Sequence, residues 1–205
     1  AGNYRLYGGW GRDRLYGGEG NDLIFSGGDY WPTTDEQGAD LVYGGAGNDR
    51  IEGSPGMDRL FGGDGNDYLS DDYYSDEGLF YGGRGHDKLY GVGKLFGGEG
   101  NDLIVGYSQS GQILLYGGEG HDKLYGGDWN DKLFGGGGND RLYGGDGDDV
   151  IYGGAGVDFA YFDGKLTDYT VVKGGAVTRI ISGDGEIDRL IDVERAVFSD
   201  GTVII

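Results

Sequence analysis

The sequence predicts an all-β fold, a two-sheet solenoid in which short parallel strands stack turn upon turn. Three observations predict it. The motif Gly-Gly-x-Gly-x-Asp-x-apolar-x recurs head to tail, with a clean copy at 17–25 and an unbroken run of five from 117 to 161. A period of nine matches neither an amphipathic helix nor a continuous strand, but it does match a six-residue turn followed by a three-residue strand. Aspartate and the apolar residue stay in phase over 17 units, which a disordered glycine-rich linker would not maintain.

Each position of the repeat has a physical reason. Glycine at positions 1, 2 and 4 permits positive φ and a tight turn, and aspartate at position 6 ends that turn with a carboxylate. Side chains alternate along a strand, so position 8 faces inward while positions 7 and 9 face outward. The predicted core therefore consists of the position-8 residues, namely Leu6, Leu15, Ile24, Val42, Ile51, Leu60, Leu69, Phe80, Leu89, Leu95, Ile104, Leu115, Leu124, Leu133, Leu142, Ile151 and Ala160.

The composition favours a cation as the partner. The chain carries 36 acidic and 16 basic residues, a formal charge of −20, which repels nucleic acid and anionic membranes and attracts cations. It has no cysteine and no apolar run near the roughly 18 residues that a membrane span needs. The chain opens at Ala1 inside a partial repeat without a signal peptide, so we expect a domain or fragment of a longer protein.

These repeats resemble the RTX (repeats-in-toxin, hemolysin-type) calcium-binding β-roll. The resemblance implies a right-handed parallel β-roll in which two nonapeptides make one turn, so that loops alternate between two edges. It also implies that each Ca²⁺ ion lies between loops two repeats apart on the same edge. We expect the roll at 1–161 and a C-terminal, β-rich cap at 162–205. The resemblance further implies type I secretion and an extracellular, secreted or cell-surface location.

The irregular loops test this alternation, because they all fall on one edge. Counting loops from 8–13, the second, fourth and later even loops form what we call the even edge, and the others form the odd edge. Every even loop is an intact GGxGxD. The odd edge contains an insertion at 30–37, the loop GSPGMD, the segments 71–78 and 106–112, and a shortened loop at 91–93. Random mutation of the repeats would affect loops on both edges, so the restriction of irregular loops to the odd edge predicts a roll with two distinct edges.

The predicted calcium ligands follow from the two edges. Eight even loops leave seven gaps, and the odd edge adds three, which predicts about 7–10 ions. The segment with Asp71, Asp72 and Asp76 is not expected to hold one. The predicted carboxylate ligands are Asp22, Asp49, Asp67, Asp87, Asp102, Asp122, Asp140 and Asp158 on the even edge, with Asp13, Asp40, Asp58, Asp131 and Asp149 on the odd edge. The predicted backbone carbonyl ligands are those of Gly18, Gly20, Gly45, Gly47, Gly63, Gly65, Gly83, Gly85, Gly98, Gly100, Gly118, Gly120, Gly136 and Gly138.

Calcium is expected to decide whether the chain folds. One apolar residue per nine is a thin core, and ordering the glycine-rich backbone costs about 1–2 kcal/mol per residue. A site with a dissociation constant of roughly 10⁻⁴–10⁻³ M stabilises the fold by about 0.4–1.4 kcal/mol at ~1 mM calcium. The prediction is an unfolded metal-free chain and a folded calcium-loaded one.

The outward faces carry a second candidate function. Position 9 of one sheet is aromatic throughout, and position 7 beside it alternates cations with aliphatic residues. The row either stabilises the sheet as a ladder or offers a recognition face for a glycan or a partner protein. Aromatic residues of the enlarged odd loops form a further candidate ligand-binding set. The row comprises Tyr16, Tyr43, Phe61, Tyr81, Phe96, Tyr116, Phe134 and Tyr152, and the loop set comprises Tyr30, Trp31, Tyr73, Tyr74 and Tyr107.

The last forty residues leave the repeat. Segments 168–173, 176–182 and 202–205 read as strands, and 188–200 is expected to be a short helix or turn. They resemble the tail that follows RTX repeats, and an apolar tail covers the end of a solenoid.

The sequence does not predict an enzyme. His86 and His121 both occupy the variable fifth position of a repeat, and HExxH, GxSxG and P-loop motifs are absent. We therefore expect a non-catalytic calcium-binding module of a type I-secreted bacterial protein that caps or templates its parent, which could itself be an enzyme. The alternative is a carbohydrate-binding or adhesive module, and a third, weaker reading is a polysaccharide enzyme built on the solenoid.

Overall fold

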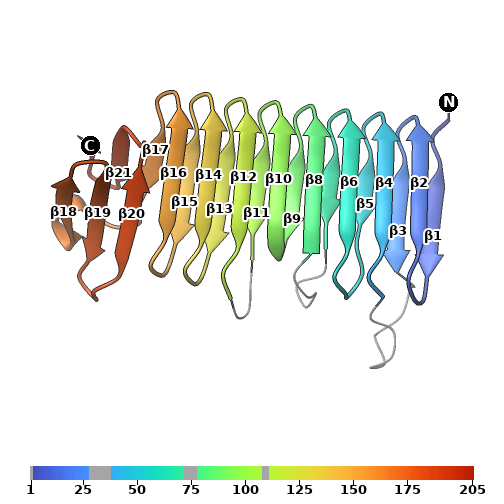
Figure 1. Cartoon of the computed structure of the whole chain (residues 1–205), viewed down its shortest axis with the longest axis horizontal. Helices are drawn as coiled ribbons and strands as arrows, with labels where there is room; N and C mark the ends of the chain where they lie inside the picture. Colours follow the sequence, from blue (N-terminus) through green and yellow to red (C-terminus); the bar gives the residue numbers. More distant parts are fainter. Residues whose placement is uncertain (1, 28–37, 72–77, 108–110) are drawn as a thin grey trace.

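The structure, a computed structural model, describes residues 2–27, 38–71, 78–107 and 111–205. It is an elongated parallel β-roll whose turns succeed one another along the long axis of the molecule (Figure 1). Two sheets of 11 strands each face one another across the core. The predicted fold class is therefore confirmed, and the 17 strands of the repeats are β1 to β17.

The first sheet, sheet I, contains β1 (Arg5–Gly9), β3 (Leu23–Gly27), β5 (Arg50–Glu52), β7 (Tyr68–Ser70), β9 (Lys88–Gly91), β11 (Leu103–Gly106), β13 (Lys123–Gly127), β15 (Arg141–Gly145), β17 (Phe159–Tyr161), β21 (Arg195–Phe198) and β22 (Gly201–Ile204). Sheet II contains β2 (Arg14–Glu19), β4 (Leu41–Ala46), β6 (Arg59–Asp64), β8 (Gly78–Arg84), β10 (Gly93–Glu99), β12 (Leu114–Glu119), β14 (Lys132–Gly137), β16 (Val150–Ala155), β20 (Ile187–Ile191), β19 (Val177–Ser182) and β18 (Tyr169–Gly174). One short 3₁₀ helix, η1 (Leu166–Asp168), precedes β18.

Successive turns stack in register, so each repeat position forms a straight column. Leu95 of β10 pairs with Leu115 of β12, and Gly98 pairs with Gly118. The position-8 residues from Ile24 to Ala160 are all buried. Leu6 and Leu15 are only partly buried, because they lie in the outermost described turn of the roll. Each column therefore fixes where the side chain of its repeat position lies across the roll, including the aspartates of position 6.

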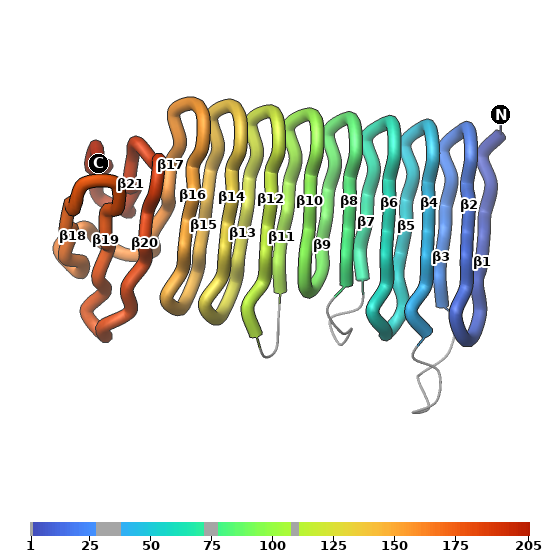
Figure 2. Tube along the Cα trace, in the orientation of Figure 1, coloured from blue at the N-terminus to red at the C-terminus, as the bar shows by residue number. Residues whose placement is uncertain are grey.

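The two edges of the roll are the two sets of loops. The loops that lead from sheet II into sheet I form the even edge, which runs along the top of Figures 1 and 2 as a regular series of equal bends. The loops that lead from sheet I into sheet II form the odd edge at the bottom. Along the described part of the chain, no helix is long and apolar enough to cross a bilayer.

The C-terminal segment continues both sheets before it closes them. β20 pairs in parallel with β16, and β21 pairs in parallel with β17. The expectation of a helix at 188–200 was wrong, because parallel pairing with the last turn makes 188–191 and 195–198 strand, whereas 199–200 form a turn. β18, β19 and β22 then add antiparallel strands, which confirms the three strands expected there. The proposed division at residue 161 stays a prediction.

Candidate metal-binding edges

A column of buried aspartates runs along the even edge. From Asp49 onward, the Oδ1 atom of each aspartate accepts a hydrogen bond from the backbone N–H of the aspartate one turn earlier, at 2.7–2.9 Å, and Asp22 Oδ1 accepts that of Tyr4. Asp49, Asp67 and Asp87, for example, follow one another in this chain of contacts. The strands fix their backbone and the hydrogen bonds fix their side chains, so the structure brings together all eight carboxylates predicted for this edge.

The second carboxylate oxygen has no partner in the protein. A buried carboxylate oxygen without a hydrogen bond is costly unless a cation compensates its charge. Among the described residues, the buried Oδ2 atoms without a hydrogen-bond partner include those of Asp13, Asp22, Asp49, Asp67, Asp87, Asp102, Asp122, Asp131, Asp140, Asp149 and Asp158. Eleven of the 13 predicted carboxylate ligands are therefore in this state, and it is the condition that a bound metal ion would relieve.

The same burial changes the acidity of these groups. Loss of hydration, opposed by the hydrogen bond from the preceding turn, raises the pKa of Asp67, Asp87 and Asp122 to about 7. It raises the pKa of Asp149 to about 8, with a further contribution from the neighbouring Asp188. In the absence of a cation the stacked carboxylates therefore hold protons that a free aspartate releases.

The glycines leave space for an ion beside these oxygens. A Cβ atom on Gly44 would lie 2.4 Å from Asp49 Oδ2 and 2.6 Å from the carbonyl oxygen of Gly62 in the next turn. Gly45 has a φ of +118°, and its Cβ would lie 2.1 Å from the carbonyl oxygen of Gly18 in the preceding turn. Carbonyl oxygens of both flanking turns thus border the gap beside the carboxylate.

The donor set fits a hard cation. Within the described ranges, no three His, Cys, Asp or Glu side chains come together to bind a metal ion. An ion must therefore take most of its ligands from backbone carbonyls, with carboxylates supplying the charge, and calcium accepts such an all-oxygen, irregular set. The carbonyls predicted at positions 2 and 4 lie at these gaps. The sequence analysis missed those of position 1, such as Gly62, although that glycine is equally constant in the motif.

The side chain at the fifth position of the repeat, which varies in residue type, has a structural role that the sequence did not predict. The side chain of Asn21 accepts the backbone N–H of Asn48, and Asn48 accepts that of Asn66. His86 and His121 enter the same ladder, because each Nδ1 accepts the backbone N–H of the asparagine in the next turn at 2.7–2.8 Å. In this ladder the backbone N–H of one turn donates to the side chain of the preceding turn, whereas in the aspartate column it donates to the side chain of the following turn. Each even loop is therefore hydrogen-bonded to the loops on both sides of it.

The odd edge is divided into two separate columns. At its beginning, Asp13 N–H donates to Asp40 Oδ1 and Asp40 N–H donates to Asp58 Oδ1, each at 2.8 Å. The Oδ2 atoms of Asp40 and Asp58 have partners, because Ser54 Oγ donates to Asp40 and both Ser26 Oγ and Ser54 N–H donate to Asp58. The gap between Asp40 and Asp58 is consequently less suited to an ion than the gaps of the even edge.

Apolar groups fill the middle of the odd edge. Gly78, Gly93 and Ile113 stand at position 6 where the other loops have aspartate, and Ile113 is fully buried. The ring of Phe80 occupies the adjacent space, so that a Cβ on Gly91 would lie 2.3 Å from Phe80 Cε2. Among the described residues, position 6 of this edge therefore lacks a carboxylate from Gly78 to Ile113, although the buried Asp71 brings its carboxylate near that of Asp58, since a Cβ on Gly53 would lie 2.8 Å from Asp71 Oδ1 and 3.0 Å from Asp58 Oδ2. Asp72 and Asp76, weighed above as an improvised site with Asp71, lie outside the described residues.

Two acidic residues of the C-terminal segment extend the columns, and the sequence analysis missed both. Asp149 N–H donates to Asp188 Oδ1 at 2.9 Å on the odd edge, and Asp158 N–H donates to Glu194 Oε2 at 2.7 Å on the even edge. Burial raises the pKa of Asp188 to about 7. The signal was present, because Asp188 and Leu190, like Glu194 and Ala196, keep the spacing of positions 6 and 8.

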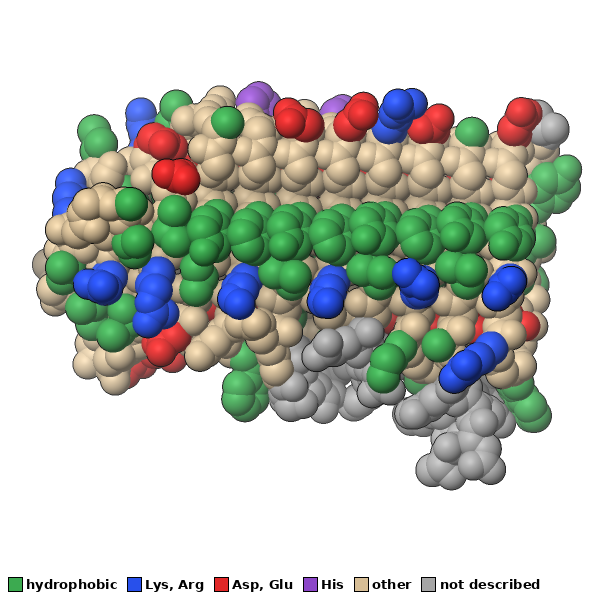
Figure 3. All heavy atoms as spheres, viewed as in Figure 1, with side chains coloured by type: hydrophobic (Ala, Val, Ile, Leu, Met, Phe, Trp, Pro, Cys, Tyr) green, Lys and Arg blue, Asp and Glu red, His purple; other side chains and the backbone are tan. Residues whose placement is uncertain are grey.

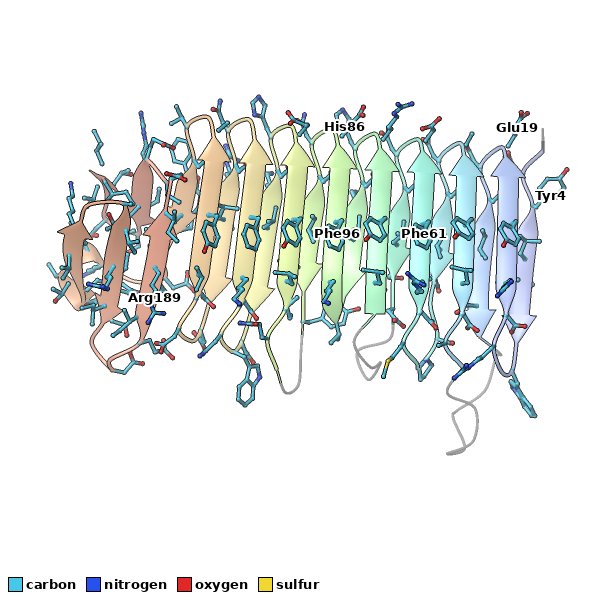
Figure 4. The ribbon with its side chains drawn as sticks, in the orientation of Figure 1. Tyr4, Glu19, Phe61, His86, Phe96 and Arg189 are labelled. Atoms are coloured by element: carbon cyan, nitrogen blue, oxygen red, sulfur yellow. The ribbon has the colours of Figure 1, made fainter. Side chains whose placement is uncertain are left out.

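The aromatic row forms a continuous stack on the outward face of sheet II, visible as the hydrophobic band in Figure 3 and as the row that includes Phe61 and Phe96 in Figure 4. Neighbouring rings are nearly parallel, with centroids 4.5–5.2 Å apart. The end residue Tyr16 is 61% exposed, whereas the other seven are half-buried by their neighbours. This packing accounts for the row as a stabilising ladder.

The predicted odd-edge ligand set is only partly visible. Tyr30, Trp31, Tyr73 and Tyr74 lie outside the described residues. Tyr107 was expected to project from its loop, but it is half-buried and its hydroxyl donates to the backbone carbonyls of Asp71 and Tyr90 at 2.6 and 3.4 Å. Its role in this structure is to tie turns together.

Comparison with known families agrees with this geometry. A family described as the RTX calcium-binding nonapeptide repeat matches the chain at residues 1–29, 36–69, 79–92, 94–113, 114–131 and 125–160. These matches cover well over half of the chain. No curated protein matches it.

Proposed function

Because the chain belongs to the family of RTX calcium-binding nonapeptide repeats, we propose that binding of calcium along its two edges is what folds it. Calcium is the ligand of these repeats. When bound, the ion supplies the positive charge that the buried carboxylates lack. The rest of the chemistry belongs to the chain, whose glycine loops present carbonyl oxygens and whose aspartates present charge.

The column of buried Oδ2 atoms without hydrogen-bond partners is the observation that carries the proposal. A fold that buries so many carboxylates is unfavourable without cations, because each pays a desolvation penalty and repels its neighbours. Only a thin apolar core opposes this cost. The same fold becomes favourable once the charges are compensated, which makes folding dependent on calcium concentration.

The two edges are proposed to differ in their calcium content. We assign ions to the gaps of the even edge, and on the odd edge to the gap between Asp13 and Asp40 and the gap between Asp131 and Asp149. The gap between Asp40 and Asp58 is proposed to bind more weakly, because serine hydroxyls already donate to its carboxylates. The stretch around Ile113 is proposed to bind none.

The biological use of calcium-dependent folding follows from the difference in calcium concentration between the two sides of a cell envelope. RTX repeats are typical of secreted bacterial proteins, and we propose that this chain is exported unfolded at low calcium and folds in external calcium. We further propose that the repeats are non-catalytic, and that the folded roll caps or templates an upstream part of its parent protein, which could be an enzyme. The C-terminal segment would cover the exposed end of the core.

A calcium titration tests the folding proposal. Far-ultraviolet circular dichroism of the chain should change from disordered to β-structure between roughly 0.1 and 1 mM calcium, and EDTA should reverse the change. Magnesium at the same concentrations serves as the control, since it prefers rigid octahedral sites. A β-spectrum that EDTA leaves unchanged would refute the proposal.

The carbohydrate-binding or adhesive alternative is not favoured. Stacking of sugars needs exposed ring faces, and the interior rings of sheet II lie against one another. The packing of these aromatic residues is explained by the stability they give the sheet.

A further inference from the structure

A hollow lies on the outward face of sheet I, next to the even edge. Its volume is about 380 Å³, and three successive turns contribute to it through the strands β13, β15 and β17 and the even loops before β13 and β15. The residues that line it are His121, Asp122, Lys123, Asn139, Arg141 and Phe159.

The hollow coincides with a break in the charge pattern of the roll. At position 7, a cation on one strand is followed by an uncharged residue on the neighbouring strand one turn later. This spacing avoids two like charges directly opposite each other, an arrangement that destabilises a sheet. Sheet II follows this rule from Arg14 to Val150, and sheet I follows it from Arg5 to Lys123. Lys123 and Arg141 break it, because they are paired in register on neighbouring strands.

Among the described residues, no carboxylate forms an ion pair with either of these two cations. Both side chains are exposed, and within the described residues neither forms an ion pair or a hydrogen bond. Asp122 lines the same hollow, but its carboxylate is buried and ion-pairs with neither cation. Its Oδ1 accepts the N–H of Asp102, and its Oδ2 is buried.

The remaining lining residues add donors and an apolar wall. His121 Nδ1 accepts the N–H of Asn139 at 2.7 Å, so Nε2 is the nitrogen that carries the proton. Asn139 Oδ1 accepts the N–H of Val157 at 2.8 Å, which leaves its amide nitrogen as a donor. The ring of Phe159 has the guanidinium of Arg195 5.2 Å from its centroid.

We propose that this hollow is an oxyanion site for a small sugar acid or sugar phosphate, whose carboxylate or phosphate pairs with Lys123 and Arg141 and whose ring packs on Phe159. A guanidinium offers a planar pair of donors that matches either group. The volume is that of a small-ligand site. Lys123 and Arg141 offer only two positive charges, so the ligand carries one oxyanion group rather than many.

The chain contains its own control. The repeats at 82–90 and 117–125 both carry His-Asp-Lys, as His86-Asp87-Lys88 and His121-Asp122-Lys123. One turn later, Leu103 pairs with Lys88 where Arg141 pairs with Lys123. The first location therefore has the same His-Asp-Lys segment without a second cation at position 7, and its loop carries Arg84, which is ion-paired with Asp64 and Glu99, where the other loop carries Glu119.

Nuclear magnetic resonance of the ¹⁵N-labelled chain in saturating calcium tests the proposal, with glucose 6-phosphate and glucuronate as probes and glucose as the neutral control. Amide shifts at 121–123, 139–141 and 159 with either anion support it, and the anion that responds identifies the group. Lys123→Gln and Arg141→Gln should each weaken binding about tenfold, as expected for loss of a charge-assisted hydrogen bond. Lys88→Gln should leave it unchanged.

Four results would overturn it: no response to either anion, equal shifts with glucose, an equal effect of Lys88→Gln, or shifts along all the aspartate columns. The last would mean that the probe merely removes calcium. Circular dichroism in calcium confirms that each variant is folded.

Discussion

Replacing Asp122 by asparagine should have opposite effects with and without calcium. Asparagine keeps an oxygen that can accept the N–H of Asp102, as Asp122 Oδ1 does at 2.8 Å. It removes the charge from the buried position of Oδ2. Asp122 lies between Asp102 and Asp140 in its column, so it borders two gaps. At ~1 mM calcium each gap is worth about 0.4–1.4 kcal/mol, and loss of both lowers the free energy of unfolding by about 1–3 kcal/mol.

Without calcium the sign reverses. Burial raises the pKa of Asp122 to about 7, so at pH 8 the folded metal-free chain carries an unfavourable buried charge there. Asparagine removes that charge and favours folding. Urea denaturation in calcium and refolding by an osmolyte in EDTA, both followed by circular dichroism, measure the two effects. Asp146→Asn, at an exposed loop position, is the matched control and should change neither. A variant that destabilises the chain equally in both conditions would refute the reasoning.

Three further predictions use urea midpoints or circular dichroism. Gly136→Ala should lower the free energy of unfolding in calcium by at least about 3 kcal/mol, because its Cβ would lie 2.1 Å from Gly118 O at a φ of +112°. Gly127→Ala, whose Cβ would lie 3.3 Å from its nearest neighbour, should lower it by only about 1–2 kcal/mol. Equal losses would contradict the close approach of the carbonyl oxygen at Gly136. Trp129→Gly should raise stability by about 0.5–1 kcal/mol, since this residue holds a φ of +80° where other loops have glycine; a loss would show that the ring is needed. In EDTA the free energy of unfolding should fall as the pH rises from about 4 to 8. Burial raises carboxyl pKa values, that of Asp149 to about 8, so in this pH range the folded chain binds more protons than the unfolded chain. More β-structure at pH 8 than at pH 5 would contradict this prediction.

The repeats could be predicted from sequence because one residue type serves one role in every turn. Phase alone placed Ile24, Leu95 and their equivalents in the core and aligned the aspartates of each edge. The alternation of intact and irregular loops located the weak stretch of the odd edge. The structure adds the physical reason there, since Phe80 and Ile113 fill the space with apolar atoms.

The parts that failed depend on tertiary contacts. Segment 188–200 lacks the glycine loop and its apolar spacing is compatible with a helix, so only its parallel pairing with β16 and β17 decides for strand. The acceptor role of Asn48 or His86 needs the neighbouring turn to be known. Tyr107 likewise turns inward because carbonyls of two neighbouring turns are within reach.

Diffraction from crystals grown in calcium, with the anomalous signal of the metal located, tests the central claim most directly. A row of peaks should lie between successive even loops from 17–22 to 153–158, beside the Oδ2 atoms that lack protein partners. On the odd edge, peaks should occur near Asp13 and near Asp131 and be absent around Ile113. Empty even-edge gaps, or metal beside Ile113, would contradict the account.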